Sequence, residues 1–156
     1  MAINAEHPLQ IRPATVTDLT KLAALEAELF ADVVYPAFFF RQAHDLWPDL
    51  LRLACRGDQL LGYILAAPAQ QGPGEIGILS LAVAQAAQGQ GIGKMLLTDL
   101  LQVLPADGKK LWLTVAPDNK AAVALYQKFG FQSVKTEADY YGKGEHRMVL
   151  VKQHAG

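Results

Sequence analysis

The segment Gln88–Lys94, with the sequence QGQGIGK, is the part of the chain whose residue types most directly predict chemistry. It follows an apolar segment that we expect to be a strand, and it opens a segment with helical periodicity. Glycines let a backbone adopt positive φ and approach a ligand closely. The first turn of a helix adds free N–H groups and a positive dipole end. We therefore expect an anion such as a pyrophosphate to bind here, although a tight strand-to-helix turn without a ligand would use the same glycines.

Two well-known phosphate-binding loops are excluded by the spacing. A P-loop needs Gly-x4-Gly-Lys followed by Ser or Thr, but Gln88 stands where the first glycine belongs and Met95 follows Lys94. A dinucleotide-binding fingerprint needs Gly-x-Gly-x-x-Gly, and here the third glycine comes one residue early. Nucleotide hydrolysis and dinucleotide binding are therefore not expected.

A second candidate pair is Asn119 and Tyr126, in a segment with helical periodicity. They are seven residues apart, which is about 20° short of two full helical turns, so we expect both on one helix face, along an elongated cofactor. Asn119 could also be an ordinary helix-start residue, and Tyr126 a packing aromatic with its hydroxyl in solvent. The glycine loop upstream makes the ligand-binding interpretation the better one.

Taken together, these motifs resemble the GNAT superfamily of N-acetyltransferases. The acyl-CoA signature of that family, Gln/Arg-x-x-Gly-x-Gly/Ala, is matched by Gln88, Gly91 and Gly93. The family pattern Asn-x-x-Ala-x-x-Leu-Tyr-x-x-x-Gly-Phe is matched by Asn119, Ala122, Leu125, Tyr126, Gly130 and Phe131. Asp139-Tyr140-Tyr141 also fits, so the resemblance extends from Ile78 to Val151. The combination is highly specific, whereas each piece alone is not.

The resemblance implies acetyl-CoA as the acetyl donor. The backbone N–H groups of Gln88, Gly89, Gln90, Gly91, Ile92, Gly93 and Lys94 would cradle the CoA pyrophosphate. Leu81, Ala82 and Val83 would pair with the pantetheine arm, at a bulge and a splayed gap between two strands, and Asn119 and Tyr126 would contact the cofactor. The acceptor amine would attack the thioester directly, with the Val83 N–H stabilising the oxyanion. The phenol of Tyr126 would protonate the leaving thiolate.

The residue that takes the proton of the amine is less evident from the sequence. The chain most resembles the branch that acetylates the N-terminal alanine of a ribosomal protein, but that branch has a catalytic glutamate where this chain has Thr114. Glu75 is the candidate to act through water, as a glutamate in this strand does in some relatives; a solvated strand-end carboxylate is the alternative. His146, Glu145 and Tyr140 are no better placed, and bulk water would suffice for an amine that arrives neutral.

The sequence thus predicts an enzyme, an acyltransferase that N-acetylates a small primary amine or a protein N-terminus. The alternative is a non-catalytic acyl-CoA-binding sensor of the same fold, which would not require an acid at Tyr126. The acceptor pocket is expected to involve Phe30 to Phe40 and the loop Tyr140 to Glu145. Within it, at least one of Phe38, Phe39 and Phe40 is expected to pack against the sheet instead.

Composition limits the other function classes. The 156 residues are 51% hydrophobic and 19% charged, with a net charge of -1, which predicts one packed globular domain over residues 1–156 and no nucleic-acid partner. Cys55 is the single cysteine, so we expect neither a disulfide nor a cysteine-rich metal site, and we interpret its thiol as core packing. Met1 to Gln10 has no signal-peptide pattern and nothing resembles a membrane span, so the expected location is the cytoplasm. Monomer and homodimer both remain open.

The positions of these residues depend on an α/β fold with a GNAT-like mixed, mostly antiparallel sheet flanked by helices, in the order β-α-α-β-β-β-α-β-α-β-β. The expected strands are Leu9–Pro13, Leu50–Cys55, Gln59–Ala67, Glu75–Ala84, Lys110–Val115, Phe131–Ala138 and His146–Lys152. The expected helices are Thr15–Phe30, Gly91–Leu104 and Asp118–Phe129, and Pro36–Trp47 is expected to be an aromatic-rich helix or loop. Turns are expected at Gly57, at Gln70–Gly74 and at Gly108.

Overall fold

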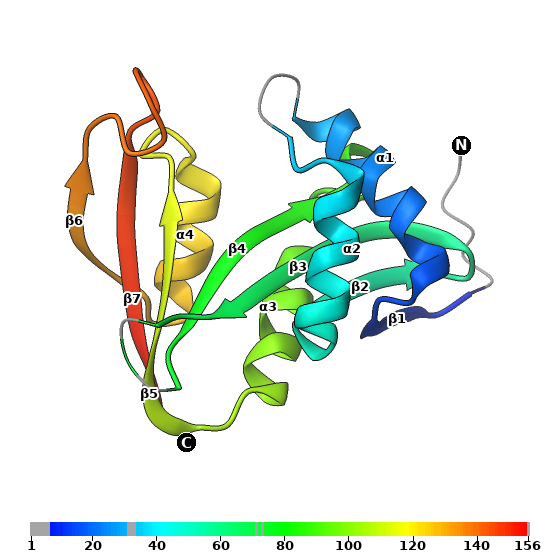
Figure 1. Ribbon diagram of the computed structural model, residues 1–156, viewed down its shortest axis with the longest axis horizontal. Coiled ribbons are helices and arrows are strands. Elements are labelled where there is room, and N and C mark those ends of the chain that lie inside the picture. Colours follow the sequence, from blue (N-terminus) through cyan, green and yellow to red (C-terminus); the bar gives the residue numbers. More distant parts are fainter. Residues whose placement is uncertain (1–6, 31–33, 71, 73, 156) are drawn as a thin grey trace. The chain divides into compact units, whose positions relative to one another are not determined.

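A computed structural model describes residues 7–30, 34–70, 72 and 74–155. Its elements, with η for short 3₁₀ helices, are β1 (Leu9–Pro13), η1 (Val16–Asp18), α1 (Leu19–Leu29), α2 (Ala37–Leu46), η2 (Pro48–Leu50), β2 (Leu51–Arg56), β3 (Gln59–Pro68), β4 (Ile76–Val83), η3 (Gln85–Ala87), α3 (Ile92–Val103), β5 (Asp107–Val115), α4 (Lys120–Lys128), β6 (Gln132–Glu137) and β7 (Arg147–Ala155). Figure 1 shows these elements in chain order by colour.

The sheet confirms the predicted fold class. In the described part of the chain seven strands follow the order β1-β2-β3-β4-β5-β7-β6. β4 pairs with β5 in parallel, while β1–β2, β2–β3, β5–β7 and β6–β7 are antiparallel. Several boundaries differ by a few residues, and in one place the element type differs: the expected turn at Gly108 lies inside β5, which begins at Asp107. Gly108 has φ +81° and the pairing with β7 shifts register between Asp107 and Lys110, so this glycine forms a bulge.

The backbone contacts divide the chain into two compact units, which we describe separately. The N-terminal unit consists of Met1–Ala66 and Ser80–Leu104, and the C-terminal unit of Ala67–Leu79 and Pro105–Gly156. β4 therefore contributes residues 76–79 to the C-terminal unit and residues 80–83 to the N-terminal unit. None of the helices among the described residues is long and apolar enough to cross a membrane.

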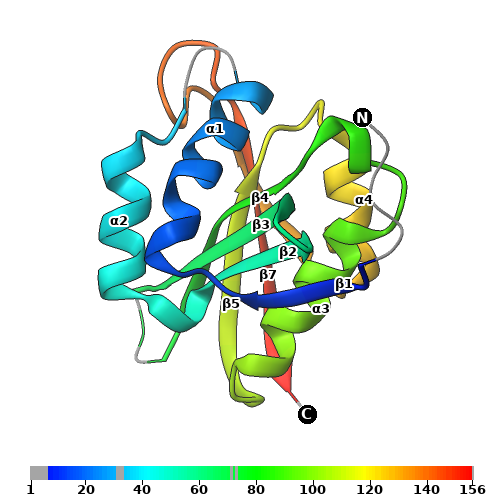
Figure 2. The ribbon, with the colours of Figure 1, turned by 90° about the vertical axis from the view of Figure 1, so that its right-hand side faces the viewer.

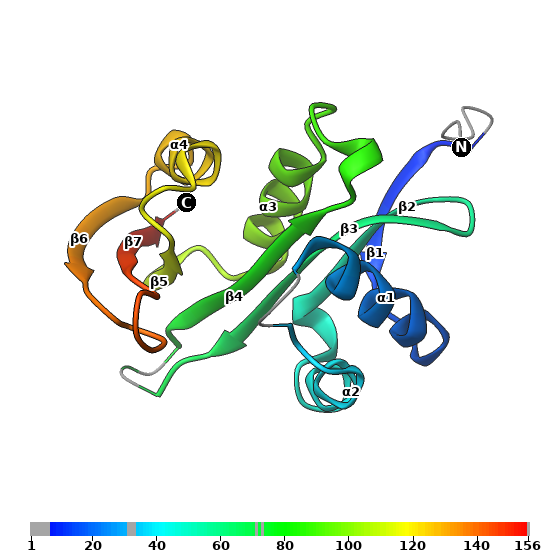
Figure 3. The ribbon, with the colours of Figure 1, turned by 90° about the horizontal axis from the view of Figure 1, so that it is seen from above.

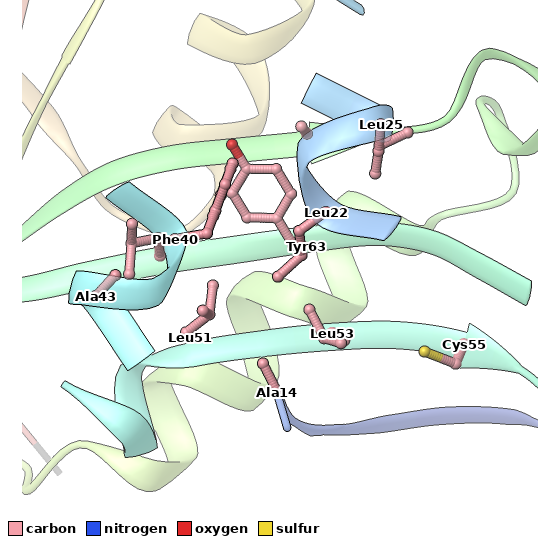
Figure 4. Packing of buried hydrophobic residues seen from close by; sticks show 11 residues of the cluster. Ala14, Leu22, Leu25, Phe40, Ala43, Leu51, Leu53, Cys55 and Tyr63 are labelled. Atoms are coloured by element: carbon pink, nitrogen blue, oxygen red, sulfur yellow. The ribbon is translucent and has the colours of Figure 1, made fainter. Parts of the chain in front are cut away.

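The core of the N-terminal unit lies between its strands and the helices α1 and α2. Figure 3 shows these two helices on one side of β1–β3 and α3 on the other. Close packing of apolar side chains from both layers excludes water from the cluster, whose buried members are Ala14, Leu22, Leu25, Phe40, Ala43, Leu51, Leu53, Cys55, Tyr63, Leu65 and Ala82. Figure 4 shows the ring of Tyr63 between Phe40 of α2 and Leu22 of α1. The predictions that Cys55 and one of the three phenylalanines serve packing are confirmed.

The C-terminal unit is built on the antiparallel strands β5, β7 and β6, with α4 along β5 and β7 (Figures 1 and 3). Leu111, Leu113 and Leu150 are buried, whereas alternate residues of β5 are partly exposed. Gly77 of β4 lies against the indole of Trp112, since a Cβ at residue 77 would come within 3.2 Å of two ring carbons. The absence of a side chain at residue 77 therefore leaves room for the indole beside β4.

Candidate active site

The predicted glycine loop has the backbone geometry that its sequence requires. Gly89 has φ +83° and Gly91, the residue immediately before α3, has φ +78°. Both values lie in the left-handed region that side-chain-bearing residues rarely adopt. A Cβ at either position would meet nothing within 4 Å, so packing within the described residues does not explain these glycines. At these two positions the loop presents its backbone to open space.

The start of α3 supplies the hydrogen-bond donors of this loop. Ile92, Gly93 and Lys94 form the first turn, where N–H groups have no partner inside the helix. The turn carries no acidic side chain, and Lys94 adds a positive charge. The chain reaches this turn from the end of β4 through η3 and the glycine loop (Figure 2). The arrangement is thus suited to an anion, as the spacing predicted.

Gln88 has a role within the loop itself. Its side-chain Nε2 donates a hydrogen bond to the backbone oxygen of Val83 at 3.1 Å, which ties the loop to the end of β4. On its other side β4 packs closely against β3, because a Cβ at Gly62 of β3 would lie 2.7 Å from the Ala82 oxygen. Leu81 and Val83 are partly buried and Ala82 is buried. The predicted residues Leu81–Val83 and Gln88–Lys94 therefore belong to one continuous feature of the N-terminal unit.

Asn119 and Tyr126 lie in the C-terminal unit, and the predicted helix start needs a correction. α4 begins at Lys120, and Asn119 is its N-cap, with φ −80° and ψ 71° and its side chain accepting the Ala122 N–H at 3.3 Å. Asn119 therefore has the helix-start role that the sequence analysis gave as the alternative to cofactor binding. Asn is a favoured N-cap residue, and the predicted helix Asp118–Phe129 began two residues before α4 does. The structure accounts for Asn119 as a cap, and its contact with a cofactor stays a prediction.

Tyr126 is buried, with 7% of its surface exposed, and its ring packs edge-on against Phe131 at a centroid distance of 5.8 Å. Burial raises the pKa of its phenol to about 12. The hydroxyl therefore keeps its proton throughout the physiological range. It can donate a hydrogen bond there, but it is a weaker acid than a phenol in water.

Thr114, which stands in the place of the glutamate of the resembled branch, contacts the loop before β7. Its Oγ1 lies 3.2 Å from the Oη of Tyr141, and either hydroxyl can be the donor. The Arg147 guanidinium lies 5.2 Å from the centre of the Tyr141 ring, a cation–π distance. His146 serves the same loop, because its Nδ1 accepts the Asp139 N–H at 3.1 Å. His146 thus has a structural partner.

Glu75, the other predicted catalytic residue, precedes β4 and folds back over the turn before it. Its backbone N–H donates to Gly72 at 3.1 Å, and its Oε1 lies 3.9 Å from Lys110 Nζ. The Oε2 atom is buried without a hydrogen-bond partner among the described residues, and the side chain is 18% exposed. The carboxylate is therefore not the solvated strand-end group that formed the alternative to a catalytic role.

The sequence analysis missed a buried polar network in the N-terminal unit. Glu26 of α1, 3% exposed, accepts hydrogen bonds from the Tyr63 hydroxyl at 2.5 Å and from the Tyr35 N–H at 3.0 Å. The Tyr63 hydroxyl also lies 2.9 Å from Oγ of Ser80 on β4. A signal was present, because Glu26 follows Leu22 and Leu25 with the spacing of the apolar face of α1. A carboxylate at such a position requires buried partners.

The predicted acceptor pocket is only partly described. Residues 31–33 of the Phe30–Phe40 segment lie outside the described residues. Of the three phenylalanines, Phe38 is 66% exposed and Phe40 is fully buried. Phe39 stacks on Tyr35 at 4.4 Å between ring centres. The β4–β5 pairing runs over three pairs, from Ile76–Leu111 to Ile78–Leu113, all within the C-terminal unit. The predicted splayed gap beyond them stays a prediction.

Comparisons with known proteins agree with this geometry. The model of the acetyltransferase (GNAT) family matches residues 16–131, which belong to both units. A relative named N-alpha-acetyltransferase RimI, from Mycobacterium tuberculosis, is 37% identical over 139 residues, which are 86% of this chain and 85% of that protein. The ribosomal protein bS18-alanine N-acetyltransferase of Salmonella typhimurium is 38% identical over 68 residues, 43% of this chain and 46% of that protein.

Among solved structures, Arabidopsis thaliana Naa50, in complex with the bisubstrate analogue CoA-Ac-MVNAL, superimposes with a TM-score of 0.81 and 25% identity. The superposition covers 93% of this chain and 98% of that one. The predicted resemblance, including the ribosomal-protein acetyltransferase branch, is therefore confirmed.

Proposed function

Because the chain belongs to the acetyltransferase (GNAT) family, we propose that it is an N-acetyltransferase that passes the acetyl group of acetyl-CoA directly to a primary amine. The observation that carries the proposal is the loop Gln88–Lys94. Its positive φ values at Gly89 and Gly91, its open surroundings and its position at the start of α3 together suit a pyrophosphate. The family match covers residues of both units, which supports one acetyltransferase domain over residues 1–156.

The roles of the other residues follow from the chemistry of a thioester. Leu81–Val83 would hold the pantetheine arm, with Asn119 as a further cofactor contact, and the Val83 N–H would stabilise the oxyanion that forms when the amine attacks. Tyr126 would act on the leaving thiolate. Transfer from a phenol of pKa about 12 to a thiolate of ordinary pKa about 8.5 is uphill by roughly 5 kcal/mol. Tyr126 would therefore stabilise the sulfur mainly by donating a hydrogen bond.

The acceptor that we propose to test first is a protein N-terminus, because RimI, named an N-alpha-acetyltransferase, is 37% identical over most of both chains. A small primary amine is the alternative, since Thr114 replaces the glutamate of the resembled branch. Glu75 would remove the amine proton through water, and this role would require its carboxylate to leave the turn at Gly72.

The test is thiol release from acetyl-CoA, measured over a panel of N-terminal peptides and small amines, together with calorimetric titration of acetyl-CoA. Saturable binding with amine-dependent thiol release supports the transferase. Binding without release by any amine would instead support the acyl-CoA sensor. Failure to bind any acyl-CoA would contradict both functions.

A further inference from the structure

The network of Glu26, Tyr63 and Ser80 has a fixed direction. An ionised carboxylate can only accept hydrogen bonds, so the 2.5 Å contact requires the Tyr63 hydroxyl to donate to Glu26 Oε1. The single phenolic proton of Tyr63 is then used in the hydrogen bond to Glu26. Ser80 Oγ–H must therefore be the donor in its 2.9 Å contact with Tyr63. The lone pairs of Ser80 remain available to accept a proton, so the bonds run from Ser80 through Tyr63 to Glu26.

Glu26, the last residue of this series of hydrogen bonds, is a buried charge. Glu26 is 3% exposed, and none of the ion pairs found among the described residues includes it. Its two oxygens are held by the Tyr63 hydroxyl and the Tyr35 N–H. Neither partner carries a formal charge, and a proton delivered along the Tyr63 hydrogen bond would convert Glu26 to a neutral carboxylic acid.

The near end lies on the strand that the proposed function uses. Ser80 is partly exposed and directly precedes Leu81–Val83 on β4. We propose, on the basis of the proposed function, that Ser80, Tyr63 and Glu26 form a proton relay that takes the proton from the acceptor ammonium, with Glu26 as the final acceptor. In this proposal Glu26 of α1 takes the role of the glutamate that the resembled branch has at the position of Thr114.

The relay step conserves atoms and charge. The ammonium gives one proton to Ser80 Oγ, Ser80 passes its own proton to Tyr63 Oη, and Tyr63 passes its proton to Glu26 Oε1. One N–H bond of the substrate is broken and one O–H bond forms on Glu26. The products are a neutral amine, able to attack the thioester, and a neutral carboxylic acid. The two hydroxyls end as they began, each carrying one proton.

The environment of Tyr63 keeps its hydroxyl protonated. Burial, and then the hydrogen bond to Glu26, raise the pKa of Tyr63 far above its ordinary value. Glu26 from α1 and Tyr35 from the segment before α2 are the titratable groups that act on this phenol. Tyr63 therefore stays protonated at working pH, and in the proposed relay it gives its proton to Glu26 only as it receives one from Ser80.

The test compares Glu26→Gln and Ser80→Ala with the wild type, and Glu28→Gln is the matched control on the exposed side of the same helix. We expect kcat/KM near neutral pH to fall by about 10²-fold or more in both relay variants. The loss should shrink as pH rises and vanish above the pKa of the acceptor amine, where the amine arrives neutral. Calorimetric affinity for acetyl-CoA should be unchanged.

Ser80→Ala keeps the bond between Glu26 and Tyr63, so it tests the relay even if Glu26→Gln is too unstable to fold. A loss of equal size at every pH, or no loss, in Ser80→Ala would overturn the relay and leave the proposed function intact. A wild type that binds acetyl-CoA but acetylates no amine at any pH would overturn the proposed function, and the relay with it.

Discussion

The loop Gln88–Lys94 and the patch formed by Thr114, Tyr141 and Arg147 differ in the chemical groups that they present. The loop relies mainly on backbone groups, with two glycines at positive φ and the first turn of α3. It adds the side chain of Gln88, which ties it to β4, and the cation of Lys94. The patch consists of side chains, two hydroxyls 3.2 Å apart and a guanidinium over a tyrosine ring. A backbone site suits a group shared by every reaction of a family, whereas a side-chain site can change with one substitution. We therefore expect donor binding to depend on the loop and acceptor choice on the patch.

The largest effect should come from Gly91→Asp. A side chain at φ +78° strains the backbone, and a carboxylate there repels the phosphates. We expect the affinity for acetyl-CoA, measured by calorimetry, to fall by about 100-fold or more, equivalent to about 2.7 kcal/mol. Gly108→Asp is the control, because Gly108 has φ +81°, equally open surroundings and a place in the C-terminal unit. Unchanged affinity in Gly91→Asp would contradict the loop assignment.

Tyr126→Phe should have the next largest effect, and on turnover alone. Removing the phenolic donor should lower kcat by about 10²-fold, while calorimetry shows unchanged affinity for acetyl-CoA. Because burial raises the pKa of this phenol to about 12, its proton is lost only above that pH, so wild-type kcat should show no decline from Tyr126 below about pH 10. Full turnover in the variant would exclude the role.

Glu75→Gln separates the two routes proposed for the amine proton. If the relay of the N-terminal unit operates, the acidic limb of the kcat/KM profile should be the same in the variant as in the wild type. Glu75 would then serve only the turn that it covers and its contact with Lys110. Disappearance of that limb would instead assign the proton to Glu75.

The smallest effects are expected in the patch itself. Thr114→Val and Tyr141→Phe each remove one hydroxyl of a half-exposed pair, a change of about 1 kcal/mol. We expect about a fivefold increase in KM for the acceptor in either variant, with no change in the affinity for acetyl-CoA. In the double variant the two effects should not add, because each single change already breaks the same contact. Additive effects, or an equal change in acetyl-CoA affinity, would remove the distinction between the two regions.

The same contrast explains how much the sequence could predict. The element order and the loop geometry were predictable, because alternation, helical periodicity and glycine spacing act over a few neighbouring residues. The helix-start role of Asn119 was available from the sequence as the alternative to cofactor binding, because Asn is a favoured capping residue. The helix start itself was placed two residues early, because residues before a helix can continue its spacing. Glu26, Tyr63 and Ser80 are 37 and 17 residues apart along the chain, so their contact depends on tertiary packing that no local pattern encodes. Gly108 was expected in a turn because tight turns often place a glycine at positive φ, and the bulge in β5 uses the same conformation.

The indole of Trp112, which lies against Gly77, gives the protein a spectroscopic probe of its own. The ring belongs to β5 and rests on β4, so its emission should respond to any change in the spacing of these two strands. Trp47 is the only other tryptophan, and Trp47→Phe would leave a single fluorophore. Titrating that variant with donor or acceptor would follow events at β4 without an attached label.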